Sequence, residues 1–412
     1  MAVPSDIIII GAGPTGLIAA ERLAKSGHRV AIHERMPSPA RKFLLAGRGG
    51  LNLTHSEDLE HFLTRYGPAR AFLEPALRTF TPQDLRDWAE GLGQKTFIGS
   101  SGRVFPESFK ASPLLRAWLA RLGDLGVTLR SHSLWTGWDS EGALAFTEAN
   151  GASTLLSPRA TLLALGGASW PRLGSDGGWA PQLRAKGVSI SELAPSNSGV
   201  EIGWSAVFRE KFAGEPLKRI AVGLGGESRR GEAVITERGL EGGVIYALSR
   251  PIREAIALHG QARLWIDLRS DLGEDALVRH LARPRGGQSF STFLRKAAKL
   301  PPVAIGVLRE ATGGSLPAEP IELARLIKRA TLTVTGQRGL DRAISTAGGI
   351  AFAEIDRHYM LRRLPGTFVA GEMLDWEAPT GGYLLQACFA TGIAAAKGIE
   401  AWLTQSPGDI AR

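Results

Sequence analysis

The sequence contains a single cysteine, Cys388, among its 412 residues. One cysteine cannot form a disulfide, a dithiol redox pair or an iron–sulfur ligand set within one chain. The eight histidines lack the regular spacings of zinc ligands, so we expect no metal site. No apolar run reaches the roughly 18 residues of a membrane helix, and no signal peptide is evident at the N-terminus. These absences predict a cytoplasmic protein with no membrane partner.

What the sequence does contain is typical of a folded protein with more than one domain. Hydrophobic residues make up 44% of the chain and charged residues 22%. The length is enough for two or three domains, each with a core of its own. The oligomeric state is not predictable from this composition.

The first 35 residues have the pattern of a βαβ nucleotide-binding unit. Ile7 to Ile10 form an apolar run that predicts a buried parallel strand. The three glycines that follow meet three demands: Gly11 allows a tight turn, Gly13 lets the backbone approach a pyrophosphate, and Gly16 lets a helix pack against the strand. We expect that helix to begin at Pro14, with its positive end facing the phosphates, and to stop at Gly27.

Glu34 ends the second strand of this unit, 18 residues after Gly16. A carboxylate at this place accepts the ribose hydroxyls of an adenosine and disfavours a 2′-phosphate. A glycine-rich turn alone occurs in many α/β proteins. Here the first strand, the helix, the second strand and the acidic residue all occur in the order and at the spacing of a dinucleotide-binding unit. The unit therefore predicts a dinucleotide, either FAD or NAD.

Three further glycine-rich stretches point to the same ligand. The first runs from Lys42 through Gly47, Arg48, Gly49 and Gly50 to Asn52, and it suggests an extended backbone beside an anionic group, although an ordinary loop is the alternative. The second follows an apolar strand at Leu165-Gly166-Gly167. The third ends a strand at Gly371-Glu372 and begins a helix at Gly381-Gly382 that runs through Gln386 and Ala395.

Together these stretches resemble the FAD-dependent flavoproteins of the YhiN/BaiN type, often labelled aminoacetone-oxidase-family enzymes, over nearly the whole chain. The similarity also includes Arg103-Val-Phe-Pro106 and Thr346-Ala-Gly-Gly-Ile350 with Glu354. It implies an enzyme with FAD as cofactor. One departure matters, because the family usually has a cysteine and a second asparagine where this chain has Leu51 and His55.

The resemblance assigns roles to individual residues. It places the pyrophosphate at Thr15 and the glycines, the ribose at Glu34, the adenine side at Arg35, and the ribityl chain and ring at Lys42, Arg48 and Asn52. The helix at Gly381 would direct its positive end at the flavin, where reduction develops negative charge. The full predicted cofactor set is Gly11, Gly13, Pro14, Thr15, Gly16, Glu34, Arg35, Lys42, Gly47, Arg48, Gly49, Asn52, Leu53, Leu134, Leu165, Gly166, Gly167, Gly371, Glu372, Gly381, Gly382 and Tyr383.

No catalytic acid can be assigned from the sequence. Arg48, His55 and Tyr383 are candidates because they lie in the motifs, and each is also a candidate for binding alone. Cys388 follows Gln386 on the last helix and is expected to be a small packed residue rather than a nucleophile.

The segment in the middle of the chain has a different pattern. Short alternating segments broken by glycine, such as Lys218 to Leu224 and Arg263 to Leu268, predict antiparallel strands. Residues 275 to 329 show helical spacing. We therefore predict an α/β protein in which a Rossmann-like FAD-binding domain, residues 1–195 and 346–412, contains an inserted β-barrel with a small helical subdomain, residues 196–345.

Positive charge is concentrated in this insert. Residues 250–345 contain 16 Lys and Arg against 9 Asp and Glu, whereas the rest of the chain is nearly balanced. A basic surface that only solvates the protein is one interpretation, and an RNA substrate is the other. Arg325, Lys328 and Arg329 are spaced to share one helical face.

The implied chemistry is a flavin redox reaction. No second Gly-x-Gly-x-x-Gly occurs, so NAD(P)H as reductant would visit only transiently. The resemblance implies reduction of a conjugated C=C bond, in a steroid-like acid or in a uracil of ribosomal RNA, or oxidation of a small amine such as aminoacetone. The charge of the insert favours RNA, and a flavin-bearing binding protein without turnover is the alternative from another class.

Overall fold

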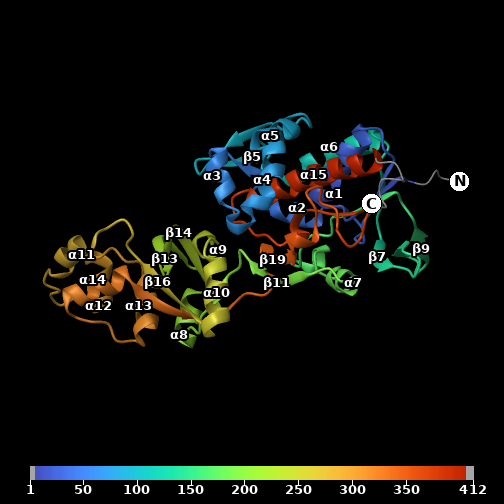
Figure 1. Ribbon diagram of the computed structural model, residues 1–412. Helices are drawn as coiled ribbons and strands as arrows, with labels where there is room; N and C mark the ends of the chain where they lie inside the picture. The colour runs from blue at the N-terminus through green and yellow to red at the C-terminus, as the bar shows by residue number, and fades with distance from the viewer. Residues whose placement is uncertain (1–4, 405–412) are drawn as a thin grey trace. The chain divides into compact units, whose positions relative to one another are not determined.

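The computed structural model describes residues 5–404. These residues form two compact units (Figure 1). The first contains the chain up to Ala194 and again from Ser345, and the second contains Pro195–Ile344. Within residues 5–404, no helix has the length and apolar character that a membrane span requires.

A five-stranded parallel sheet forms the centre of the first unit. Its strands are, in spatial order, β20 (Thr367–Val369), β10 (Ala160–Leu163), β1 (Ile7–Ile10), β2 (Val30–His33) and β6 (Thr128–Arg130). All four residues of β1, β2 and β10 are buried, as expected for strands that are covered on both faces. The strand order reverses direction between β1 and β10, the kind of place where open α/β sheets bind their ligands.

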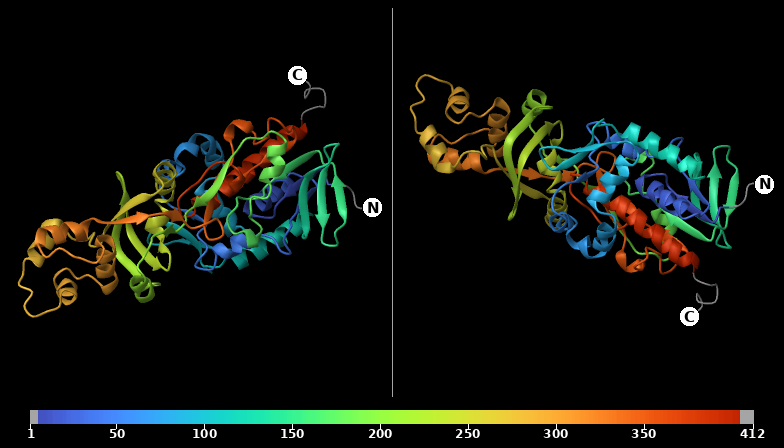
Figure 2. Two further views of the ribbon diagram at one scale, coloured as in Figure 1. Left: turned by 90° about the horizontal axis from the view of Figure 1, so that it is seen from below. Right: turned by 90° about the horizontal axis from the view of Figure 1, so that it is seen from above.

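Three helices pack on this sheet and build one continuous core with it. They are α1 (Pro14–Lys25), α6 (Ala111–Asp124) and α15 (Tyr383–Thr404). Helix α1 begins at Pro14, as predicted, and the chain leaves it at Gly27 with a φ of 84°. Helices α1 and α15 lie side by side in both views of Figure 2, and Gly392 allows this contact because a Cβ there would lie 2.7 Å from the Thr15 carbonyl oxygen.

Smaller elements surround the parallel sheet. Two antiparallel sheets consist of β7 (Ser133–Trp138), β8 (Leu144–Glu148) and β9 (Ser153–Leu156), and of β3 (Thr54–His55), β5 (Arg103–Pro106) and β4 (Thr96–Ile98). Strands β11 (Ile190–Ser196) and β19 (Ser345–Ile350) pair with each other. The remaining α-helices are α2 (Arg41–Ala46), α3 (Leu59–Thr64), α4 (Arg70–Thr79), α5 (Pro82–Glu90) and α7 (Ala180–Ala185). Short 3₁₀ turns are η1 (Gly67–Ala69), η2 (Pro171–Leu173), η3 (Phe352–Glu354) and η4 (Gly371–Met373).

The stretch that follows β2 corrects one expectation. The sequence suggested extended backbone from Lys42 to Asn52, but the structure contains helix α2 up to Ala46 and a turn at Gly47–Gly49. The residues of α2 are strong helix formers, and Phe43 is buried on one side of it. Strand β3 begins only at Thr54.

The second unit contains a seven-stranded antiparallel sheet. Its order is β17 (Ala330–Val334), β16 (Ala262–Asp267), β13 (Pro216–Leu224), β14 (Glu227–Thr236), β15 (Gly239–Glu241), β12 (Val200–Glu201) and β18 (Gly336–Gln337). The first and last strands in this order are consecutive in the chain, with only Thr335 between them, and the Thr335 N–H donates to the carbonyl of Glu201. The sheet therefore curls back on itself as a barrel.

Helices of the second unit form a separate core with this barrel. They are α8 (Ala206–Phe212), α9 (Gly243–Tyr246), α10 (Ser249–His259), α11 (Glu274–Leu281), α12 (Phe290–Ala297), α13 (Pro302–Thr312) and α14 (Pro320–Lys328).

The prediction that Arg325, Lys328 and Arg329 share one face of helix α14 is wrong. Lys328 points inward, where its Nζ lies 2.6 Å from Asp267 and donates to two backbone carbonyls. Arg329 lies beyond the end of the helix with its guanidinium 5.2 Å from the Trp265 ring, and Arg325 pairs with Glu274. Periodicity could not reveal this, because Asp267 comes from a distant strand.

Candidate functional site

The first unit contains a cavity of about 350 Å³ at the carboxyl ends of β1, β2 and β10. Gly11 follows β1, Glu34 follows β2 and Leu165 follows β10, and all three line the cavity. Loops at this edge, the N-terminus of α1, and residues of α2, β7, α7 and α15 complete the wall. The position is the one at which doubly wound sheets bind nucleotides.

The three glycines of the first turn have separate roles. A Cβ on Gly11 would lie 2.3 Å from the Ala164 carbonyl oxygen, and one on Gly16 would lie 2.0 Å from the Gly11 carbonyl oxygen. These two glycines are therefore required by the protein's own packing. A Cβ on Gly13 would meet nothing within 4 Å, because Gly13 faces the open cavity. Packing within the described residues therefore does not require a glycine at this position, and its role toward a pyrophosphate stays a prediction.

The predicted cofactor residues fall into two groups. Those that line the cavity are Gly11, Gly13, Pro14, Thr15, Glu34, Arg35, Lys42, Leu134, Leu165, Gly166 and Glu372. Those that are not part of its lining are Gly16, Gly47, Arg48, Gly49, Asn52, Leu53, Gly167, Gly371, Gly381, Gly382 and Tyr383. The assignment of all these residues to the cofactor remains a prediction.

Glu34 also forms hydrogen bonds with the backbone next to the cavity. Its carboxylate accepts from the backbone N–H of Ala12 at 2.9 Å and from that of Met36 at 2.8 Å. Its neighbour Arg35 pairs with Asp176 at 2.8 Å across the cavity wall. A ribose that binds to Glu34 would therefore meet a carboxylate whose orientation is already fixed.

Four polar atoms of the cavity lining are buried and have no hydrogen-bond partner among the described residues. They are Arg35 Nε, Arg41 Nε, Trp135 Nε1 and Ser175 Oγ. Buried polar groups in native proteins are nearly always hydrogen-bonded, and three of these four atoms are obligate donors. A dinucleotide supplies acceptors in its phosphates, riboses and adenine, so the residues of this cavity fit FAD.

His33 connects the cavity to a buried hydrogen-bond chain. The Ser133 hydroxyl donates to Glu148 at 3.1 Å, so its contact of 2.8 Å with His33 requires an N–H on Nδ1 of the imidazole. Burial, with a smaller effect of Arg130, lowers the pKa of His33 to about 4. The ring is therefore neutral at physiological pH, with a lone pair on Nε2.

A partly buried ion pair also lines the cavity. Lys42 Nζ contacts Glu372 at 2.7 Å and Ser169 at 2.6 Å, and Glu372 also accepts from the backbone N–H of Thr346. The Thr346 hydroxyl accepts in turn from the backbone N–H groups of Ala168 and Ser169. The network joins α2, the loop after β10, β19 and η4.

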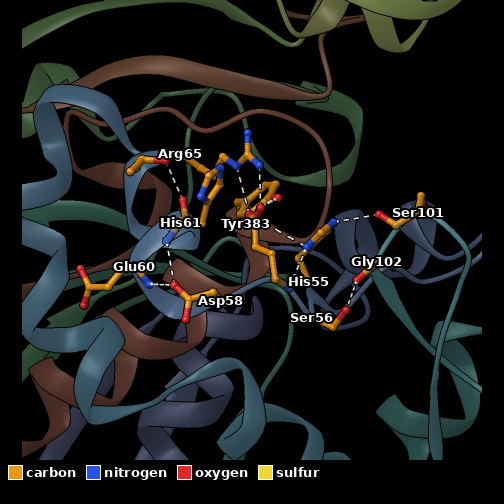
Figure 3. Close-up of polar contacts among 11 residues, drawn as sticks. His55, Ser56, Asp58, Glu60, His61, Arg65, Ser101, Gly102 and Tyr383 are labelled. Carbon is orange, nitrogen blue, oxygen red and sulfur yellow. Dashed lines mark hydrogen bonds and ion pairs between the residues drawn. The ribbon is translucent and has the colours of Figure 1, made fainter.

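A second polar cluster lies at the N-terminus of α15 (Figure 3). The Tyr383 hydroxyl donates to Glu57 at 2.6 Å, and Glu57 forms an ion pair with Arg65 at 2.5 Å. The Arg65 guanidinium lies 5.8 Å from the centre of the Tyr383 ring, and the His55 ring stacks on the same ring at 5.5 Å. The structure thus brings two of the three catalytic candidates together, whereas Arg48 is exposed on the turn after α2.

The protonation states in this cluster follow from its contacts. Burial and the hydrogen bond to Glu57 raise the pKa of Tyr383, so its hydroxyl keeps its proton. Burial opposes ionisation of Glu57, but hydrogen bonds from Arg65 and Tyr383 outweigh it and lower the pKa of that carboxyl. His55 accepts from the Glu57 N–H at Nδ1, which leaves Nε2 to donate to the Ser101 carbonyl.

The strands beside this cluster carry an apolar wall. The rings of Phe97, Phe105 and Phe109 lie 5.1–5.8 Å apart, and Phe109 is 49% exposed. Gly50 leaves room beside them, because a Cβ there would lie 3.2 Å from the Phe109 ring. His55 is paired with this same small sheet through β5.

Two polar atoms near the cluster also lack partners among residues 5–404. Asn52 Oδ1 and Thr54 Oγ1 are buried and unbonded, and a Cβ on Gly382 would lie 2.5 Å from the Thr54 Cα. Segments 52–54 and 381–382 are therefore in direct contact. Both atoms fit the nitrogen and oxygen groups along the edge of an isoalloxazine ring.

Sequence reasoning missed several residues of both sites. Glu57 and Arg65 follow His55 closely, but no motif marks them, and they meet Tyr383 only through the fold. Trp135 and Arg41 gave no signal either. Ser175 lies in a Gly-Ser-Asp-Gly-Gly turn, a composition that sequence reasoning could have flagged as a further close approach.

The first prediction concerns Gly13. Gly13→Ala should lower FAD affinity at least about tenfold, because the new Cβ occupies the open space in which the pyrophosphate approaches the backbone. FAD titration by flavin fluorescence measures this. Gly123→Ala is the matched control, because its Cβ also meets nothing within 4 Å, on helix α6. Equal FAD affinity of the two variants would contradict the prediction.

The second prediction concerns stability against pH. Below pH 6.5 the unfolded chain protonates His33, whereas the folded chain does so only near pH 4. The free energy of unfolding should therefore fall as pH decreases from 6.5 toward 4, by about 3 kcal/mol at most. Above pH 6.5 His33 is neutral in both states, so the stability associated with the neutral ring should be fully present there. Urea unfolding at a series of pH values measures the slope. His33→Gln should flatten it, and an unchanged slope in this variant would refute the assignment.

Comparisons with known proteins identify the family of this chain. The family model described as "HI0933-like protein Rossmann domain" matches residues 5–398. A 3-dehydro-bile acid delta(4,6)-reductase of Clostridium scindens is 26% identical and covers 94% of this chain and 97% of its own. A ribosomal RNA dihydrouridine synthase of Escherichia coli is 24% identical, with 96% and 98% covered.

The chain is also similar in fold to solved structures. The 3-ketosteroid delta1-dehydrogenase of Sterolibacterium denitrificans superimposes with a TM-score of 0.52 at 14% identity and covers 97% of this chain and 99% of that one. The family match covers nearly the whole chain and confirms the resemblance seen in the sequence. The chain belongs to the HI0933-like family of flavoproteins with a Rossmann domain, and it is an FAD-dependent oxidoreductase.

Proposed function

We propose that this oxidoreductase reduces a carbon–carbon double bond conjugated to a carbonyl group. The observation that carries the proposal is the protonated hydroxyl of Tyr383, held by Glu57 and Arg65 at the N-terminus of α15. Reduced FAD supplies a hydride equivalent for the β-carbon of such a bond. The α-carbon then needs a proton, which the protein has to provide.

Tyr383 is the proposed proton donor. Its O–H bond breaks as the α-carbon forms a C–H bond, and the phenolate that remains is regenerated by a proton from solvent. The positive charge of Arg65 favours this phenolate, whereas Glu57 opposes it, so the phenolate is short-lived and readily takes up a proton. The hydroxyl proton is hydrogen-bonded to Glu57 at 2.6 Å before the reaction and has to turn from Glu57 to the α-carbon for the transfer. The stacked His55 ring limits the rotation of the Tyr383 ring meanwhile.

The aromatic wall favours a flat and largely apolar substrate. Phe97, Phe105 and Phe109 offer ring faces, which bind planar or alicyclic ring systems. The Clostridium scindens relative is named as a reductase of a bile acid, a compound of this shape. A steroid-like enone is therefore the substrate class that we favour, with NAD(P)H as the proposed electron donor.

Two alternatives fit the site less well. Aminoacetone is small and polar, and it would leave the three phenylalanines without a role. A flavin-bearing binding protein would not need a tyrosine placed between a carboxylate and a guanidinium. Neither alternative accounts for the cluster at α15.

A second candidate substrate, a uracil in RNA, is favoured by one observation. Residues 276–309 contain seven Lys and Arg and no Asp or Glu. All seven cations are exposed, and they are Arg279, Arg283, Arg285, Arg295, Lys296, Lys299 and Arg309. An exposed run of one sign of charge suits a phosphate backbone. The Escherichia coli relative is named as an enzyme of ribosomal RNA.

Tyr383→Phe tests the proposal. Holoprotein reduced with one equivalent of dithionite is mixed anaerobically with testosterone, a steroid enone, and flavin reoxidation is followed by absorbance. The variant should keep its FAD and reoxidise at least about 100-fold more slowly than wild type, the usual contribution of a general acid. Tyr66→Phe is the control, because the Tyr66 hydroxyl donates to the Tyr383 carbonyl and not to the cluster.

The same experiment separates the substrates. A uridine-containing oligonucleotide serves as a second electron acceptor for the reduced protein. Reoxidation by the oligonucleotide and not by testosterone would favour the RNA candidate. If neither acceptor reoxidises the flavin, or if Tyr383→Phe reacts as fast as Tyr66→Phe, the proposal fails.

A further inference from the structure

The second unit contains a cavity of its own, with a volume of about 640 Å³. It is lined by α8, α12 and α13 together with the Gly313-Gly314 turn. Helix α13 packs against both α8 and α12, and Figure 1 shows α12 and α13 as neighbours. No residue of this cavity belongs to the site described above.

One part of this cavity is apolar. The rings of Phe208 and Phe212 lie directly on α13 at Gly306, where a Cβ would come within 2.7 and 2.8 Å of them. Ile305 and Pro302 extend this surface. Val207 also lines the cavity and is 76% exposed, an unusual exposure for a valine of a folded unit. This floor offers burial to an apolar chain or ring.

The rim of the same cavity is positively charged. Lys211, Arg295 and Arg309 line it. Arg309 donates to the Ser291 hydroxyl at 2.9 Å, and Lys211 Nζ lies 5.4 Å from the Phe212 ring. The one carboxylate of the lining, Glu310, accepts from both the N–H and the hydroxyl of Ser205. The three cations therefore outnumber the acidic groups.

We propose that this cavity binds an amphipathic carboxylate. The apolar body would lie on Phe208, Phe212 and Ile305, and the carboxylate would pair with Arg295 and Arg309, whose guanidinium groups match its geometry. The volume lies within the range of small-molecule sites. The inference does not rest on the proposed reaction, because it uses only residues of the second unit.

The test compares ligands that differ only in the head group. Isothermal titration calorimetry of the FAD-loaded protein measures the affinities of octanoate, 1-octanol and octylammonium. Octanoate should bind at least about tenfold more tightly than 1-octanol, and octylammonium most weakly. The double variant Arg295→Gln/Arg309→Gln should bring octanoate to the affinity of 1-octanol. Equal binding of the three ligands to wild type would overturn the proposal.

A second pair of variants tests the apolar floor. Val207→Asp places a carboxylate beside the cavity and should lower octanoate affinity at least about tenfold, through repulsion and loss of apolar contact. Leu258→Asp is the matched control, because Leu258 is also 76% exposed but lies on α10, outside the cavity lining. Equal octanoate affinity of these two variants would overturn the proposed site, whatever the effect of the arginine variants.

Discussion

The ion pair between Lys42 and Glu372 is the interaction on which the first unit's site depends. Glu372 is buried, and a carboxylate without compensation there would cost several kcal/mol. Lys42 supplies the opposite charge, and the N–H of Thr346 supplies a hydrogen bond. Four segments far apart in the sequence must come together for this to occur: α2, the loop after β10, the start of β19, and η4. Three of these segments, α2, the loop after β10 and η4, contribute residues to the lining of the cavity.

Helix α15 connects this cavity to the polar cluster. Cys388 lines the cavity, and Tyr383 lies five residues earlier, about 7.5 Å along the helix axis. Burial raises the pKa of Cys388 to about 12, in keeping with a packed residue. On this account one rigid helix sets the distance between the cavity, where we expect the cofactor, and the hydroxyl of Tyr383. The Gly381-Gly382 pair makes the approach feasible, since any side chain on Gly382 would collide with Thr54.

The parts of the fold that local pattern controls could be predicted from the sequence. The βαβ unit, the need for glycine at Gly11 and Gly16, and the start of α15 all follow from short-range rules, whereas the role of Gly13 stays a prediction. Contacts between distant segments could not be predicted. Examples are the hydrogen bond of Tyr383 to Glu57 and the ion pair of Lys328 with Asp267. Each joins segments that are distant in the sequence, and such contacts produce no periodic sequence pattern. Arg41 and Ser175 can be recognised as candidate binding residues only once the cavity is known, because their unpartnered Nε and Oγ atoms belong to its lining.

The central claim is that the protein saturates a C=C bond next to a carbonyl. The most direct test is the NMR spectrum of the product that reduced holoprotein forms from testosterone without oxygen. Our account predicts that the vinyl proton signal disappears while the ketone carbon remains, because hydride reaches the β-carbon and a proton reaches the α-carbon. A product that retains the vinyl proton and carries a new alcohol in place of the ketone would contradict it.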